Sequence, residues 1–351
     1  MKNFRILLLL VLASSCNGGK GQDIQSSKLR ALILDGQNNH YIWPKTTMMM
    51  KSYLEKTGLF EVDIHRTDTV WLGIKYNQSR SMPLDGYIKK FPSDSTVRVI
   101  SEEPVKTSNF YIDFSKYDVI VSNLGALTPE WPDETKRSFE NYMNEGGGLV
   151  IVHAANNAWG DWVEFNKMIG LGAWGDRNSI SGPYSYYNDD GSIEVDSSEG
   201  IAGSHGIEHE FVITSRAPEH PIMKGLPLNW LHTQDELYDR MRGPFEKATI
   251  LATAFSDVEK NEQPWEPSLK GSGWNVPMLI AINYGQGRIF HSTLGHFDYS
   301  MECVGFITTF QRGAEWAATG EVVQEVPYDF PSEEKTSSRI FTGVNLLNDI
   351  K

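Results

Sequence analysis

Histidine side chains recur in the sequence where strands are expected to end. His40 follows the apolar run 29–35, and His153 comes directly after the fully apolar run 149–152. In an open parallel sheet, the loops beyond the carboxyl ends of the strands form the ligand crevice, so two separate strands bring a histidine to the same edge. A single histidine at such a position is more often a structural hydrogen-bonding group. Two at one edge indicate a catalytic or ligand-binding site.

A second group of polar residues combines histidine with carboxylates. His232 and Glu236 are four residues apart, which places them on one face of either a strand or a helix. Asp235 and Glu236 would point to opposite faces of a strand over 230–238, so we expect only one of them to face the pocket. Glu236 is the preferred candidate because it shares a face with His232. Such groups can act as general base and general acid.

Two further histidines, His205 and His296, extend the possible chemistry. His296 follows the expected strand 288–292, and His205 lies four residues before His209. Imidazole and carboxylate ligands suit Zn, Mn or Fe, and the same groups can act as a metal-free acid and base. We therefore expect either a divalent metal held by His153, His205 and His296, or an acid/base site without a metal. The alternative is that several of these histidines only make structural hydrogen bonds.

Aromatic residues are abundant, with 10 Trp and 14 Tyr among 351 residues. Aromatic rings with polar edges form binding platforms for amphipathic ligands such as sugars. We therefore expect Trp159 and Trp174 to contact a small sugar ligand, together with His40, His232 and Arg288. Core packing is the competing explanation for most of the aromatic side chains.

The elements that must position these residues alternate between strands and helices. Apolar strands alternating with helices predict a parallel sheet covered on both faces, an α/β fold of the flavodoxin-like, doubly wound and mostly parallel type. Three long segments without periodicity, 71–109, 171–208 and 255–276, are expected to be lid or pocket-wall loops. The expected strands are 29–35, 60–65, 117–123, 149–152, 210–214, 230–238, 248–254, 278–283 and 288–292, and the expected helices are 43–57, 132–145 and 306–318.

Charge and glycine placement exclude several classes of function. The chain carries 32 basic and 45 acidic residues, a net charge of −13, which repels nucleic-acid phosphates and anionic lipid. The glycine run 146–148 precedes a strand rather than a helix, and no Lys-Ser/Thr pair follows it. It therefore cannot cradle a phosphate at a helix N-terminus, and no nucleotide cofactor is expected.

The N-terminal segment is predicted to be an export signal rather than part of the fold. Lys2 and Arg5 precede the apolar run 6–13, which is too short to span a bilayer, and small residues then lead to Cys16. This pattern resembles a bacterial lipoprotein signal, so we expect 1–15 to be removed and Cys16 to carry the lipid. The protein would then be periplasmic and attached to the membrane only through that lipid. The alternative is a plain signal peptide, with Cys16 incidental.

The rest of the chain divides into three predicted parts. Residues 16–28 are rich in Gly, Ser, Lys and Gln and are expected to form a flexible tether. Residues 29–320 form the α/β domain, and the polar, proline-bearing tail 321–351 is expected to wrap its surface. Cys303 would be unpaired, and its expected role is that of a small buried apolar residue.

Five short segments, in order, resemble the ThuA-like (trehalose utilisation) family of the class I glutamine amidotransferase-like superfamily. The resemblance implies a flavodoxin-like sheet and a link to sugar metabolism, including oxidised (3-keto) disaccharides and glycosides. Carried over by motif, it implies His153, Asp235, Glu236 and His296 as catalytic candidates. The segments are 146–155 (GGGLVIVHAA), 220–227 (HPIMKGLP), 235–238 (DELY), 284–290 (YGQGRIF) and 295–296 (GH).

One departure from the wider superfamily limits the reaction. Amidotransferases present a nucleophilic cysteine after this strand, whereas the chain has His153 there, and Cys303 is the remaining thiol. Glutamine hydrolysis is therefore not expected. Two hypotheses remain. The protein is an enzyme that isomerises, eliminates or hydrolyses a sugar or keto-sugar glycoside, or it is a non-catalytic, lipid-anchored sugar-binding or scaffold protein.

Overall fold

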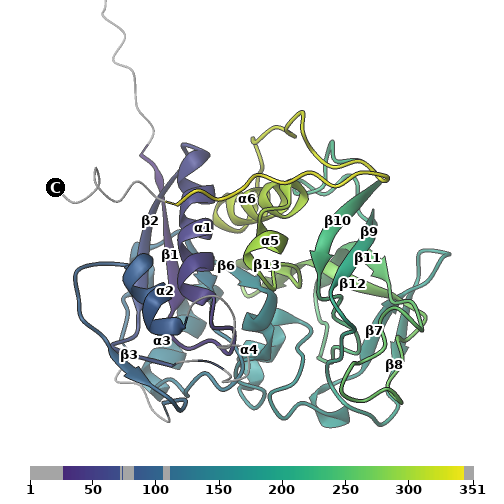
Figure 1. Ribbon diagram of the computed structural model, residues 1–351, viewed down its shortest axis with the longest axis horizontal. Coiled ribbons are helices and arrows are strands. Elements are labelled where there is room, and N and C mark those ends of the chain that lie inside the picture. The colour runs from purple at the N-terminus through teal and green to yellow at the C-terminus, as the bar shows by residue number, and fades with distance from the viewer. Residues whose placement is uncertain (1–26, 72, 74–82, 106–110, 344–351) are drawn as a thin grey trace, which may run out of the picture.

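One large mixed sheet organises the molecule. The computed structural model describes residues 27–71, 73, 83–105 and 111–343. In strand order the sheet runs β10-β9-β11-β12-β13-β6-β5-β1-β2, and β7 extends it from β12 and then pairs with β8 (Figure 1). The predicted signal peptide, the lipidation site Cys16 and most of the tether lie outside the described residues.

The first half of the sheet is parallel. All four neighbouring pairs in the order β2-β1-β5-β6-β13 run in the same direction. The central residues of β1, β5, β6 and β13 are apolar and buried, which suits strands covered on both faces, whereas the edge strand β2 is partly exposed. This is the strand order of a flavodoxin-like sheet, so the predicted fold is confirmed. The bounds are β1 (Leu29–Asp35), β2 (Phe60–Arg66), β5 (Val119–Ser122), β6 (Gly148–Val152) and β13 (Gly287–Ser292).

The second half of the sheet is antiparallel. A hairpin turns β12 back against β13, and each following strand pairs antiparallel with its neighbour. The bounds are β7 (Tyr184–Tyr187), β8 (Ile193–Asp196), β9 (His209–Ser215), β10 (Asn229–Asp235), β11 (Ala248–Phe255) and β12 (Asn275–Tyr284). A separate pair is formed by β3 (Thr69–Trp71) and β4 (Val99–Ser101).

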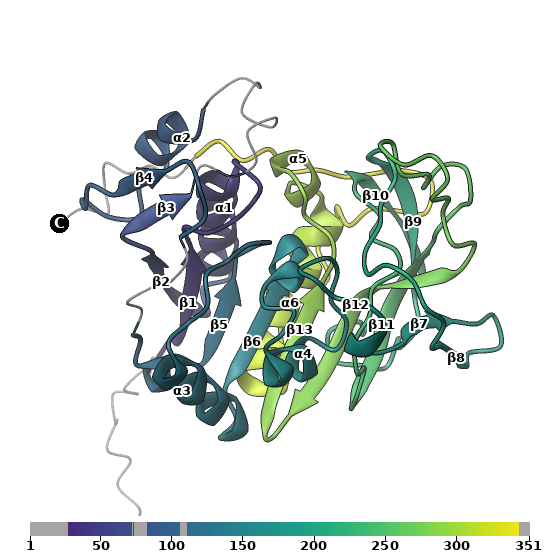
Figure 2. The same ribbon diagram turned by 90° about the horizontal axis from the view of Figure 1, so that it is seen from below.

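Helices cover both faces of the parallel half (Figure 2). One buried cluster joins α1 (Trp43–Lys56) and α6 (Val304–Thr319) to one face, and a second joins α3 (Asp133–Asn144) and α4 (Val163–Ile169) to the other. This is the doubly wound arrangement that the sequence predicts. The remaining helices are α2 (Leu84–Lys90), α5 (Asp298–Met301) and the 3₁₀ turns η2 (Phe114–Lys116), η3 (His153–Asn157) and η4 (Ser179–Ser181).

The structure corrects two expectations about the elements. The segments 71–109 and 171–208 are not structureless, since the first contains α2 and β4 and the second contains β7 and β8. These strands have only three or four residues each, too few for a period-two alternation to stand out in the sequence. The strand predicted over 230–238 ends at Asp235, and its register with β9 shifts after His232. That irregularity changes which carboxylate faces the site.

The tail after α6 runs over the surface of the domain. Its backbone is tied to β10 by the bond from Leu231 to Ser332 and to the start of α6 by the bond from Val304 to Ser337. None of the helices in the described part of the chain is long and apolar enough to cross a bilayer.

Candidate functional site

Four side chains with metal-ligating atoms converge at one edge of the sheet. Each of His40, His153, Glu236 and His296 offers one ligand atom, and these atoms lie within 4.8 Å of one another. The four residues follow β1, β6, β10 and β13. The strand β10 lies in the antiparallel half, but it runs in the same direction as β13. Four antiparallel pairings connect the two strands, through β9, β11 and β12, and an even number of reversals restores the direction. All four carboxyl ends therefore meet at the same edge.

His153 occupies a strained turn at the end of β6. Its φ is +46°, in the left-handed region that costs a non-glycine residue free energy, and its side chain is buried. The ring Nδ1 donates to the Thr293 carbonyl at 2.7 Å. Nε2 therefore points into the cluster, where it lies 2.9 Å from the Tyr238 hydroxyl and 3.5 Å from Glu236 Oε2. Burial opposes charging of this imidazole, but the hydrogen bond and charge of Glu236 outweigh it and raise the pKa of His153.

Glu236 is the centre of the cluster. Its Oε1 lies 3.3 Å from His296 Nδ1 and 3.4 Å from His205 Nε2, while Oε2 faces His153. A carboxylate surrounded by three imidazoles, and only 7% exposed, can accept a proton from any of them. The same oxygens are available to a ligand or to a cation.

A second carboxylate, Glu208, completes the acidic side of the cluster. It hydrogen-bonds His296 Nδ1 and accepts from the Tyr299 hydroxyl. Burial, aided by the negative charges of Glu236 and Asp235, raises the pKa of Glu208. The sequence reasoning missed this residue, although its position between His205 and His209 was the available signal.

His40, which follows β1, faces the histidines that follow β6 and β13. Its ring centroid is 4.6 Å from that of His296 and 5.3 Å from that of His153. Burial, and then the charges of His153 and His205, hold the pKa of His40 well below its usual range. His40 is therefore neutral, which is the form that binds a metal.

The donor set fits a divalent metal. Three imidazoles and one carboxylate are typical ligands of Zn, Mn and Fe. His153 also shows the arrangement usual for a metal-binding histidine, because its other ring nitrogen is held by a backbone carbonyl. Of the predicted set of His153, His205 and His296, the compact group contains His153 and His296, and His40 and Glu236 complete it. His205 lies beside Glu236 and lines the cavity.

Asp235 holds the cluster from behind and is fully buried. Its Oδ1 accepts the backbone N–H groups of Glu236 (2.9 Å) and His296 (3.1 Å), and its Oδ2 accepts that of Gly295 (2.8 Å). These bonds join the end of β10 to the loop after β13. Asp235 therefore fixes the backbone at two cluster residues rather than facing the cavity.

His232 pairs with Asp235 and not with Glu236, which corrects the expectation that His232 and Glu236 share a face. Its Nε2 lies 2.9 Å from Asp235 Oδ2, and both side chains are fully buried. The register shift after His232 breaks the strand alternation on which the expectation rested. Burial opposes the charge of His232, but the Cys303 thiol and Asp235 outweigh it and raise its pKa to about 10.

A cavity of about 440 Å³ opens above the cluster. His40, His205, Glu236 and His296 form its floor, and this volume suits a small organic ligand. Aromatic side chains form much of its wall, namely Trp174, Tyr238, Trp265 and Phe297.

Two indoles flank His205 at this cavity. Trp174 lies edge-on to His205 at 5.8 Å and to Tyr238 at 4.9 Å. Trp265 lies edge-on to His205 at 5.0 Å and is 61% exposed, so most of its surface is free. Trp174 was expected at the site, whereas Trp265 was missed because the segment around it has no regular pattern.

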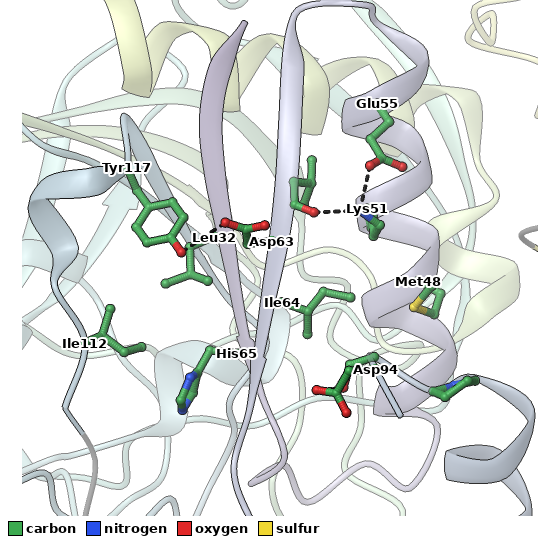
Figure 3. Close-up of a pocket in the computed structure, with 13 residues that line it drawn as sticks. Leu32, Met48, Lys51, Glu55, Asp63, Ile64, His65, Asp94, Ile112 and Tyr117 are labelled. Atoms are coloured by element: carbon green, nitrogen blue, oxygen red, sulfur yellow. Dashed lines mark hydrogen bonds and ion pairs between the residues drawn. The ribbon is translucent and has the colours of Figure 1, made fainter. Parts of the chain in front are cut away.

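A larger hollow of about 690 Å³ lies elsewhere, beside β2 and α1 (Figure 3). Its charged side chains already have partners. Lys51 bonds Glu55 and the Val62 carbonyl, both at 2.6 Å, and Asp94 pairs with Arg98 at 2.7 Å. Size alone therefore does not make it the site, and the histidine cluster carries more chemistry.

Comparisons with known proteins identify the family of the chain. Residues 87–317 match the profile of the ThuA family, which is described as trehalose utilisation. The chain belongs to the ThuA family. The match contains three of the four clustered donors, whereas His40 precedes it. A search of curated proteins found no significant match.

Solved structures of ThuA-like proteins resemble the chain. A ThuA-like protein from Parabacteroides merdae is 41% identical, with a TM-score of 0.73, and the alignment covers 89% of this chain and 98% of that one. A ThuA-like protein from Bacteroides uniformis is 15% identical, with a TM-score of 0.44, over 87% of this chain and 97% of that one.

Two residues predicted to bind substrate in this ThuA-family chain lie outside the cluster and its cavity. Arg288 donates to the carbonyls of Trp316 and Ala318 at the end of α6. Trp159 is buried, and its indole N–H donates to the Pro129 carbonyl at 2.9 Å. Both side chains serve packing and helix termination in the structure. Their sequence signals, a charge and an aromatic ring, do not distinguish that use from ligand binding.

Proposed function

We propose that this ThuA-family protein is an enzyme of carbohydrate metabolism that acts on a sugar or keto-sugar glycoside. The supporting observation is the convergence of His40, His153, Glu236 and His296 below a cavity with aromatic walls. Acid/base groups beneath an amphipathic cavity suit isomerisation, elimination or hydrolysis. The residue after β6 is His153 and not a thiol, so the proposal does not include glutamine hydrolysis.

In the proposed reaction, Glu236 is the general base. Its carboxylate faces the cavity and is within 3.5 Å of three imidazoles that can share the proton it takes. Tyr238 lies 2.9 Å from His153 Nε2, and burial raises the pKa of Tyr238 well above its usual range, so its hydroxyl keeps a proton for donation. Trp174 and Trp265 would hold the apolar face of the sugar.

A divalent metal fits the same residues. His40, His153, Glu236 and His296 would hold it, and it would supply a Lewis acid that polarises a substrate oxygen. Asp235 would keep the backbone of Glu236 and His296 in place, and Thr293 would keep His153 Nε2 directed inward. Loss of such supporting bonds commonly weakens metal binding about 10- to 100-fold.

The first test is the metal content of the purified mature chain, with Cys16 removed, measured by elemental mass spectrometry. Near-stoichiometric Zn, Mn or Fe is expected in the wild type and loss of that metal in His153→Ala. His209→Ala is the matched control, because the His209 ring bonds the Ile207 carbonyl, contacts Phe211 and lies outside the cluster. Metal-free protein after repletion would remove the metal and leave the acid/base proposal.

The second test is chemical conversion of 3-keto-glycosides by wild type and Glu236→Gln. Loss of a general base is expected to lower kcat by about 10²–10⁴-fold. Binding of the glycoside without any chemical change in the wild type would contradict an enzyme. It would favour the alternative, a sugar-binding protein whose histidines are structural.

We also propose that the protein is exported and held at the periplasmic face of a bacterial membrane by a lipid on Cys16. The signal-like segment 1–15 supports this. Mass spectrometry of the native N-terminus should find a diacylated Cys16, and Cys16→Ala should release the protein from membranes. An unmodified Cys16, or a retained residue 1, would contradict the anchor.

A further inference from the structure

A second hollow of about 410 Å³ lies beyond the histidine cluster, in the antiparallel half of the sheet. The residues that line it come mainly from β7, the loop after β8 and the segment before β12. The strands β7 and β8 lie at the end of the sheet far from β2 (Figure 2). We propose that this hollow is a second carbohydrate-binding site, which holds one sugar unit of a neutral oligosaccharide. The proposal does not depend on the reaction at the first site.

Stacked aromatic rings form one wall. Tyr184 stacks on Tyr186 at 5.9 Å, and Tyr186 stacks on Trp274 at 5.4 Å with the two planes only 8° apart. Both tyrosines are buried, whereas Trp274 is 38% exposed. The stack holds the indole in a fixed orientation at the rim of the hollow, so little side-chain entropy is lost when a ligand packs on it. The apolar face of a pyranose ring suits such a surface.

A phenol without a protein partner faces the same hollow. Tyr186 as a whole is only 5% exposed, but its hydroxyl is not among the fully buried polar atoms and has no hydrogen-bond partner among the described residues. The hydroxyl is therefore open to the hollow, where a ligand or water can bond it. Burial raises the pKa of Tyr186 above its usual range, which keeps the phenol protonated as a donor.

The charged groups around the hollow favour a neutral ligand. Arg240 is paired with Asp239 at 3.2 Å through Nη1, and its Nη2 has no hydrogen-bond partner among the described residues. Asp239 balances the Arg240 guanidinium. The Arg242 guanidinium, 3.6 Å from the Tyr184 ring centre, offsets one of the two remaining acids, Asp196 and Glu199, so the wall keeps a small net negative charge. Anionic ligands would be repelled, while sugar hydroxyls can accept from Arg240 and donate to the two acids.

The two cavities are neighbours but distinct. The backbones of Ser204 and Asp239 exchange hydrogen bonds of 3.0 and 2.8 Å, and this short β-bridge separates the two cavities. On this bridge, His205 and Tyr238 line the first cavity and Arg240 lines the second. A single oligosaccharide could therefore contact both cavities, or each could bind separately. The test separates these two cases.

The test measures binding of maltotetraose, cellotetraose and xylotetraose by calorimetry and tryptophan fluorescence, with tetragalacturonate as the anionic control. Saturable binding of a neutral probe and none of tetragalacturonate is expected. Trp274→Ala should weaken binding about tenfold by removing the stacking surface. Tyr186→Phe, which keeps the stack and removes only the hydroxyl, should weaken it severalfold.

Trp265→Ala in the first cavity is the matched control. Weakening by this variant as well as by Trp274→Ala shows one oligosaccharide across both cavities, and an unchanged affinity shows an independent site. The proposal is overturned if no neutral probe binds, if tetragalacturonate binds best, or if only Trp265→Ala affects binding. If Trp274→Ala does not fold, as judged by circular dichroism, Tyr186→Phe decides, and wild-type affinity in that variant overturns the proposal.

Discussion

Replacing Asp235 with Asn should destabilise the whole domain and disturb the cluster at a distance. The carboxylate accepts four hydrogen bonds, three from backbone N–H groups and one from His232, with no exposure to water. Asn is isosteric but has one acceptor oxygen, and its NH₂ group would face donors. It also removes the counter-ion of the fully buried His232, one of the groups that raise the pKa of His232 to about 10 in the wild type.

The magnitude follows from these contacts. Breaking a buried ion pair by removing one partner typically costs about 3–5 kcal/mol, and single hydrogen bonds to a charged group are each worth about 1.5–3 kcal/mol. These contributions overlap, so we expect the free energy of unfolding to fall by about 3–5 kcal/mol. Many domains have a total stability of only about 5–15 kcal/mol, so the loss should be large but measurable.

The assay is urea unfolding followed by circular dichroism, with Asp63→Asn as the control. Asp63 pairs with Arg30 at 2.7 Å, but both side chains are more than 40% exposed, so its loss should cost less than about 1 kcal/mol. Equal, small losses in the two variants would refute the argument that Asp235 holds β10 to the loop after β13. Folded Asp235→Asn should also bind metal about 10- to 100-fold more weakly.

Three further outcomes are expected. His291 is fully buried, and burial lowers its pKa to about 4. The free energy of unfolding should therefore fall by at most about 3 kcal/mol as pH decreases from about 6.5 to 4, because the unfolded chain takes up a proton first. His291→Gln should flatten this part of the curve of urea midpoint against pH, and an unchanged curve would contradict the role of His291. Gly313→Ala should lower the thermal midpoint despite the better helix propensity of Ala, because a Cβ there would meet the Phe290 ring at 2.1 Å; a raised midpoint would contradict the contact. Trp159→Phe should lower the free energy of unfolding by about 1 kcal/mol, because the hydrogen bond to the Pro129 carbonyl is lost. Sugar affinity, measured by titration, should stay unchanged, and a weakened affinity would place Trp159 at the ligand.

Local pattern was enough to predict the parallel half of the fold and to select the three clustered histidines, His40, His153 and His296. The apolar runs that form β1 and β6 need burial on both faces, and this requirement follows from their composition alone. Once the strands are parallel, their carboxyl ends share an edge, so His40 and His153 were expected on the same side of the sheet. The observed ring separation of 5.3 Å agrees with that reasoning.

The choice between the two adjacent carboxylates could be decided only by the tertiary structure. Period-two alternation from His232 favoured Glu236 on the same face, but the register shift against β9 turns His232 toward Asp235. Such an irregularity depends on the partner strand and on the distant N–H groups of Gly295 and His296, which Asp235 accepts. Glu236 still reaches the cavity, for a reason other than the predicted one.

The aromatic and acidic surroundings of the site also depended on the fold. Glu208 and Trp265 lie in loops, where neither periodicity nor spacing marks a residue that will face a cavity. Arg288 and Trp159 carry the expected chemistry but are used by helix α6 and by the core. Residue type and strand direction are local properties and can be read along the chain. Which side chains meet is set by contacts between segments far apart in sequence, and those contacts exist only once the chain has folded.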